Sequence, residues 1–190
     1  MMNAPYSKED VIAHLREIQQ GLRADIDAMP NAEFEREGET TWSPSGYVKH
    51  LILSLKPTAK GFNFPPEQLE STFGFAPAPS RTYQEVVVAY ESLIEQGLRA
   101  ELSDRLIPVA YRFPEGVTDE QAYLADTWDE SNDRLIAALD PWDEAALDRY
   151  QLPHPALGML TLREMLFFTL HHNTRHWQDV QQSATLSDRA

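Results

Sequence analysis

The chain has 190 residues, no cysteine and a formal charge of −14, from 30 acidic and 16 basic residues. Without cysteine, disulfides and thiolate metal sites are excluded, so a metal site would rest on imidazole and carboxylate groups. An acidic chain with scattered basic residues repels phosphate backbones, which argues against a nucleic-acid partner. With 42% hydrophobic residues, the chain is the size of one domain, and we expect residues 1–190 to form a single helical-bundle domain.

No apolar segment is long enough to cross a bilayer, and charged residues interrupt the N-terminal part of the chain. We therefore expect no signal peptide, no membrane anchor and no membrane partner. The lack of cysteine is compatible with a reducing compartment, and we expect a cytoplasmic protein.

Apolar residues recur at helical spacing from the start of the chain. Ser7 is a candidate N-cap for a first helix that should end near Pro30. Ser43 followed by Pro44 is typical of a helix start and predicts a second helix. Pro57 is expected to end or kink that helix.

Residues 61–80 contain four prolines and two glycines. This composition predicts a long ordered loop, whose phenylalanines we expect to pack on the bundle. Thr82 with Glu85 forms a capping box, which predicts a third helix that runs to about Ser103.

Thr118 and Gln121 repeat the capping-box spacing and predict a fourth helix, which Pro141 closes. A rigid turn is expected at residues 152–158, where two prolines flank a histidine. Thr161 with Glu164 then forms a third capping box, at the head of the last helix.

Strand-period alternation of useful length is absent, so the predicted class is all-α, with four or five main helices in a bundle.

The last helix carries two histidines on its apolar seam. Its seam residues follow one another at steps of three and four: Leu162, Met165, Thr169, His172 and His176. Both imidazoles should therefore face the core one turn apart, close enough to bind one ion at about 2.0–2.1 Å. One buried histidine is usually a hydrogen-bonded core residue, but two side by side need partners that a cation supplies at once.

Asn173 follows the first histidine of the pair, where zinc proteases carry a glutamate, so peptide hydrolysis of that type is disfavoured. His50, on the second helix, is the leading candidate for a third ligand, although periodicity leaves it only partly buried. His14 and His154 are expected to be structural or surface residues, as is His171, which is the reserve candidate.

Several motifs resemble those of the DinB-like superfamily of metal-binding four-helix bundles, over nearly the whole chain. They are Trp42-Ser43-Pro44, the segment at 48–51, the segment at 160–164 and the run at 172–176. The resemblance implies a DinB-like bundle with an additional helix and long proline-rich loops. It also implies that His50, His172 and His176 are the metal ligands. Pro153-His154-Pro155 with Gly158, and Phe73-Gly74, resemble a subgroup of the family.

Characterised members of that superfamily include transferases and isomerases that use a low-molecular-weight thiol and a divalent metal. The resemblance therefore implies a metal-dependent enzyme with a small-molecule substrate, a thiol cofactor and a homodimeric assembly. We expect zinc or nickel, and Arg175 beside the histidine pair is a candidate for binding a substrate carboxylate.

Three neutral imidazoles leave at least one coordination position open, as in catalytic metal sites. Two alternatives stay open. One is hydrolysis by water that the metal activates. The other is a non-catalytic, metal-stabilised bundle with an interaction or stress-response role. The sequence assigns no catalytic residue.

Overall fold

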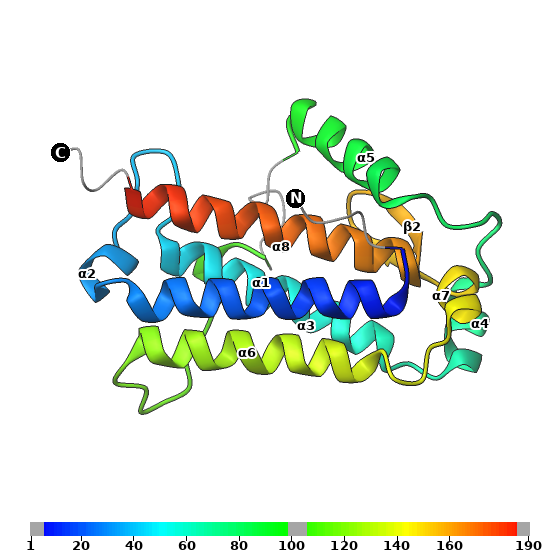
Figure 1. Ribbon diagram of the computed structural model, residues 1–190, viewed down its shortest axis with the longest axis horizontal. Helices are drawn as coiled ribbons and strands as arrows, with labels where there is room; N and C mark the ends of the chain where they lie inside the picture. Colours follow the sequence, from blue (N-terminus) through cyan, green and yellow to red (C-terminus); the bar gives the residue numbers. More distant parts are fainter. Residues whose placement is uncertain (1–5, 99–105, 186–190) are drawn as a thin grey trace.

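The structure is a computed structural model that describes residues 6–98 and 106–185. Its four long helices are α1 (Lys8–Ala28), α3 (Pro44–Phe62), α6 (Glu120–Ala138) and α8 (Leu162–Thr185). They lie alongside one another as a bundle, in which α1 and α3 each pack against both α6 and α8 (Figure 1). The all-α class and the four-helix bundle architecture are therefore confirmed. Among the described residues, no helix is both long and apolar enough to cross a membrane.

Shorter elements join these helices. They are α2 (Asn31–Phe34), α4 (Pro66–Phe73), α5 (Tyr83–Glu95), the 3-10 turn η2 (Pro108–Ala110), α7 (Glu144–Arg149), β1 (Gln151–His154) and β2 (Gly158–Thr161). The strands pair antiparallel, from Gln151 opposite Thr161 to His154 opposite Gly158. The expected turn is thus the tip of a hairpin, because strands of four residues are too short to show an alternating pattern.

The capping predictions are confirmed at four of the five helix starts. The hydroxyl of Ser7 accepts from the Asp10 amide, and Ser43, Thr82 and Thr161 cap the amides three residues after them. The start of α6 differs, because Asp119 and not Thr118 is the N-cap. Gln121 instead donates from Nε2 to the carbonyls of Ile26 and Met29, which ties α6 to the end of α1.

The prediction that Pro57 ends or kinks the second helix is wrong as to the end, since α3 continues to Phe62. Leu55, Ala59 and Phe62 are buried on both sides of the exposed proline. Their burial offsets the one backbone hydrogen bond that proline cannot donate.

The segment 61–80 is more helical than predicted, because the buried side chain of Leu69 anchors α4 within it. Its aromatic residues Phe64 and Phe73 pack against the core, as expected. The third helix ends at Glu95 and not near residue 103, and Gly97 follows with a positive φ of 102°. Residues 99–103 lie outside the described part of the chain.

The two helices α1 and α8 approach closely where α8 carries its histidines. A Cβ at Gly21 would lie 2.2 Å from the Trp177 ring, so only glycine allows this approach. The indole Nε1 of Trp177 donates to the Asp25 carboxylate at 2.6 Å. This contact fixes the rotation of α8 and with it the direction of the histidine seam.

Candidate metal centre

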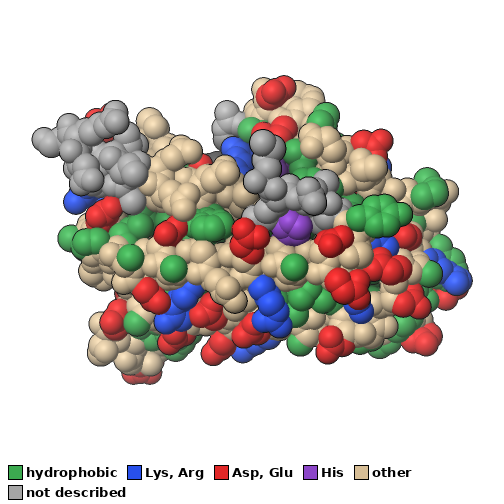
Figure 2. Space-filling model, viewed as in Figure 1, with side chains coloured by type: hydrophobic (Ala, Val, Ile, Leu, Met, Phe, Trp, Pro, Cys, Tyr) green, Lys and Arg blue, Asp and Glu red, His purple; other side chains and the backbone are tan. Residues whose placement is uncertain are grey.

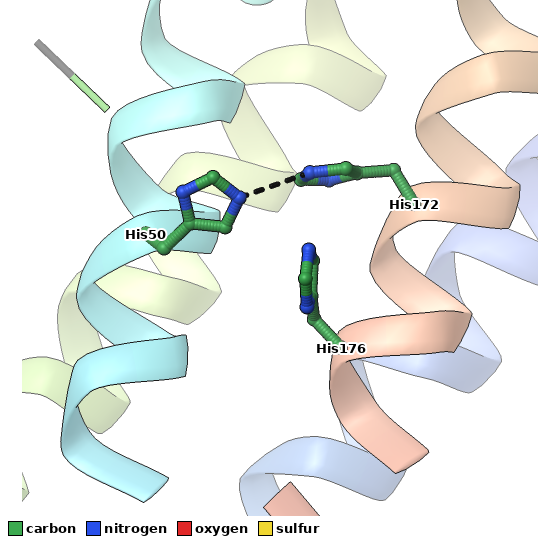
Figure 3. Close-up of side chains that lie close together, drawn as sticks. All are labelled: His50, His172 and His176. Carbon is green, nitrogen blue, oxygen red and sulfur yellow. Dashed lines mark hydrogen bonds between the residues drawn. The ribbon is translucent and has the colours of Figure 1, made fainter. Parts of the chain in front are cut away.

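Three histidine side chains from two helices point at one spot in the bundle (Figure 3). His50 comes from α3, and His172 and His176 come from α8. The Nε2 atoms of His50 and His172 lie 3.0 Å apart, and one ring nitrogen from each of the three residues lies within 4.8 Å of the others. The structure therefore brings together the three predicted ligands.

All three rings are shielded from solvent, with exposed fractions of 2% for His50, 5% for His172 and 9% for His176. His50 is more deeply buried than the periodicity of α3 predicted. The ring of Trp42 packs 5.1 Å from it, and the chain at Leu106 covers its outer nitrogen. Contacts from the chain outside α3 thus complete its burial.

The outer nitrogens of two rings are held by oxygen acceptors. Nδ1 of His50 lies 2.7 Å from the carbonyl of Leu106, and Nδ1 of His176 lies 2.8 Å from the carboxylate of Asp179. A neutral imidazole that donates from Nδ1 has a lone pair on Nε2. These contacts therefore turn the lone pairs of His50 and His176 toward the shared spot, as in most protein metal sites.

The short contact between His50 and His172 tests whether the site fits a cation. Two nitrogen lone pairs at 3.0 Å repel, so without an ion Nε2 of His172 must carry a proton and donate it to His50. A divalent ion at this point would replace that proton and attract all three nitrogens. The donor set is neutral imidazole, which suits zinc, nickel, copper and iron.

Burial keeps His50 and His172 neutral, as metal binding requires of a ligand. Burial, with a smaller contribution from the nearby His176, lowers the pKa of His50 to about 4. Burial likewise lowers the pKa of His172 well below its usual value, with a smaller contribution from His176. Protons therefore compete weakly with a metal ion at neutral pH.

The buried histidines make stability depend on pH in a defined window. Burial also lowers the pKa of His154 to about 4, so His50 and His154 stay neutral in the fold at pH values where the unfolded chain protonates them. The free energy of unfolding is therefore highest above about pH 6.5 and decreases as the pH falls toward 4. Each of the two histidines lowers it by about 1.4 kcal/mol for every pH unit. Urea unfolding of the metal-free protein between pH 7.5 and 5 measures this loss.

The substitution His50→Gln should reduce the slope of the free energy of unfolding against pH, because one of the histidines that cause it is removed. Equal stability of the wild-type protein at pH 7.5 and pH 5 would contradict the assignment of these rings as buried and neutral.

The Asp179 carboxylate is expected to raise metal affinity by orienting His176. Asp179→Asn should weaken metal binding about tenfold, because partners of this kind contribute about 10- to 100-fold and this side chain is 29% exposed. Competition titration with a coloured chelator measures the change. Asp140→Asn, at an exposed position after α6, is the matched control and should bind metal like the wild type.

Aromatic rings enclose the three histidines. Tyr47 stacks on His176 with 5.6 Å between ring centroids, and Phe168 lies 5.2 Å from His172. These rings limit the access of water and lower the local dielectric, which strengthens charge interactions inside the site.

The other histidines lie outside the cluster, as predicted. Nδ1 of His14 contacts the carbonyl of Asp10 on the surface of α1. His171 pairs with Glu91 at 2.6 Å. His154 accepts from the amides of residues 156 and 157, so its Nδ1 stabilises the hairpin tip.

Two contacts of the site were missed by the sequence reasoning. The Leu106 carbonyl is a backbone group and leaves no sequence signal. Asp179 could have been found, because a carboxylate three residues after His176 lies on the same helix face.

Comparisons with known proteins bear on the fold. No family model matches the chain, and no curated protein does. The solved structure of YfiT from Bacillus subtilis matches with a TM-score of 0.60 and 16% identity, over 95% of this chain and 87% of that chain. YfiT is described as a probable metal-dependent hydrolase with an unusual four-helix bundle topology. This chain shares its fold.

TT2238, described as a four-helix bundle protein, matches with a TM-score of 0.52 and 16% identity, over 93% of this chain and 99% of that chain. Both likenesses agree with the bundle architecture that the resemblance to the DinB-like superfamily implied.

Proposed function

We propose that this protein binds one divalent metal ion through His50, His172 and His176 and is a metal-dependent enzyme for a small-molecule substrate. The observation that carries the proposal is the convergence of three shielded imidazoles from two helices. In an apolar bundle core, one cation satisfies all three converging lone pairs at once. We propose zinc or nickel as the ion.

When bound, a divalent ion would supply Lewis acidity, which polarises a substrate oxygen and lowers the pKa of water or of a thiol. The chain's own part is to orient His50 and His176 through Leu106 and Asp179 and to exclude bulk water with the rings of Tyr47 and Phe168. Three protein ligands leave room for a substrate atom.

Two reactions are candidates. Hydrolysis is favoured by the description of YfiT, which has the same fold. Transfer of a low-molecular-weight thiol is implied by the resemblance to the DinB-like superfamily. Since the chain has no cysteine, the sulfur in such a reaction must come from the thiol cofactor. Both reactions need a nucleophile that a bound metal would activate, which is water in hydrolysis and the thiol in the transfer.

The test is turnover by protein loaded with zinc or nickel, assayed on a panel of esters and amides and on a panel of thiols with electrophiles. We expect activity with one panel that is lost in His172→Ala and kept in His154→Ala. A metal-loaded protein that is inactive on both panels, yet melts at a higher temperature than the metal-free form, would contradict the enzyme and support a metal-stabilised bundle.

A further inference from the structure

One arginine of this protein has unusual surroundings. Four arginines of the described residues are partly or fully buried. Three of these pair with carboxylates: Arg23 with Asp27, Asp126 and Asp129, Arg81 with Glu164, and Arg163 with Glu144 and Asp148. The fourth is Arg175, for which the described part of the chain contains no ion-pair partner.

The lack of a partner is unexpected in so acidic a protein. The chain has 30 acidic residues, and Asp and Glu side chains are spread over the face shown in Figure 2. A guanidinium that loses part of its hydration without gaining an acceptor raises the free energy of the fold. A cation left unpaired in this way is suited to an anion that arrives from outside.

Arg175 lies on the face of α8 that borders α5. Phe168, His171, His172 and Arg175 follow one another at helical spacing on this face. Phe168 and Tyr90 of α5 meet edge to face at 4.9 Å, and the Tyr90 ring lies 6.5 Å from that of His172. Tyr90 and this face of α8 therefore lie directly beside the metal ligand His172.

Arg175 and Tyr90 are also close to each other. Arg175 follows His171 by four residues and His172 by three, one turn along α8, and the Tyr90 ring lies 6.1 Å and 6.5 Å from those two rings. The Tyr90 hydroxyl makes no hydrogen bond to any residue in the described ranges. One donor and one cation thus stand together beside an apolar aromatic surface.

We infer that Phe168, Tyr90 and Arg175 form the substrate subsite of the metal centre and bind an organic carboxylate with an aromatic or similarly apolar body. The body packs on the two rings, and the carboxylate receives hydrogen bonds from the Arg175 guanidinium and the Tyr90 hydroxyl. The inference rests on the proposed function for its place in catalysis, because His172 borders the subsite.

The subsite would also overcome the overall charge of the protein. A net charge of −14 repels anions in general, so an anionic substrate needs a local cation that is not already neutralised. Arg175 meets that condition next to the three histidines. The substrate of the proposed enzyme is then a carboxylate and not a cation.

Benzoate is the probe, titrated by calorimetry into both metal-free and zinc-loaded protein, with acetate and benzyl alcohol as probes that lack the ring or the charge. We expect benzoate to bind more tightly than either. Arg175→Gln should weaken benzoate binding about tenfold or more, because a hydrogen bond between two charged groups is stronger than one between neutral groups. Tyr90→Phe should cause a smaller loss.

The matched control is Arg134→Gln, which removes the same charge from an exposed pair on α6 and should leave benzoate binding unchanged. Zinc affinity and melting temperature of Arg175→Gln should equal those of the wild type. Wild-type benzoate affinity in Arg175→Gln, or equal binding of benzyl alcohol and benzoate, would overturn the inference.

The two proposals fail in different ways. If the wild type takes up no metal, the proposed function fails, while benzoate binding to the metal-free protein still decides the role of Arg175. A lower melting temperature with unchanged benzoate binding in Arg175→Gln would show a structural role for the arginine and also overturn the inference.

Discussion

Replacing His172 with alanine is expected to weaken divalent-metal binding by at least about 100-fold. Each of the three ligands contributes several kcal/mol to the free energy of metal binding. The three rings form a triangle, in which the centroid of His172 lies 5.0 Å from that of His50 and 4.6 Å from that of His176. Its loss leaves only two ligand nitrogens for the ion. Zinc titration against a chelator measures the affinity.

His50→Ala and His176→Ala should cause losses of the same order. The matched control is His14→Ala, whose half-buried ring on α1 lies outside the cluster of three histidines. That variant should bind zinc like the wild type. Equal affinity of the His172→Ala and His14→Ala proteins would mean that zinc binds elsewhere on this acidic surface.

Removing the carboxylate of Glu164 is expected to cause the second large effect, a loss of about 3 kcal/mol in the free energy of unfolding. Its side chain is 7% exposed and accepts from the amide and guanidinium of Arg81 and from the amide of Thr161. Glu164→Ala leaves these donors without an acceptor. Urea unfolding of the metal-free protein measures the loss.

The same substitution should affect the proposed substrate subsite, which includes Tyr90 of α5. Arg81 directly precedes Thr82, the N-cap of α5, so its link to Glu164 anchors α5 on α8. Benzoate binding should therefore weaken in Glu164→Ala, because Tyr90 is on α5. The control is Glu130→Ala, which removes an exposed pair with Arg134 and should change stability by about 0.5 kcal/mol or less. Equal stability of the two variants would contradict the anchoring role.

The long helices could be predicted because each has a local signal. Ser7, Ser43 and Thr82 have short polar side chains placed before apolar series, and the capping geometry depends on residues only three positions apart. The elements that escaped prediction depend on distant contacts. The hairpin at 151–161 forms from two strands of four residues, and Tyr150 pairs with Phe75 of a remote loop.

The candidate site divides in the same way. His172 and His176 follow from the spacing of one helix, whereas His50 needed the resemblance to the DinB-like superfamily. Its burial comes from Leu106 and Trp42, and no periodicity within α3 contains that information. When the ligands come from different helices, the periodicity of the sequence predicts only those that share one helix.

Elemental analysis of the untagged, purified protein tests the account most directly, before and after dialysis against zinc or nickel. We expect about one ion per chain in the wild type and about none in the His50→Ala, His172→Ala and His176→Ala proteins. A wild-type protein that stays substoichiometric in zinc, nickel and manganese would contradict the metal centre.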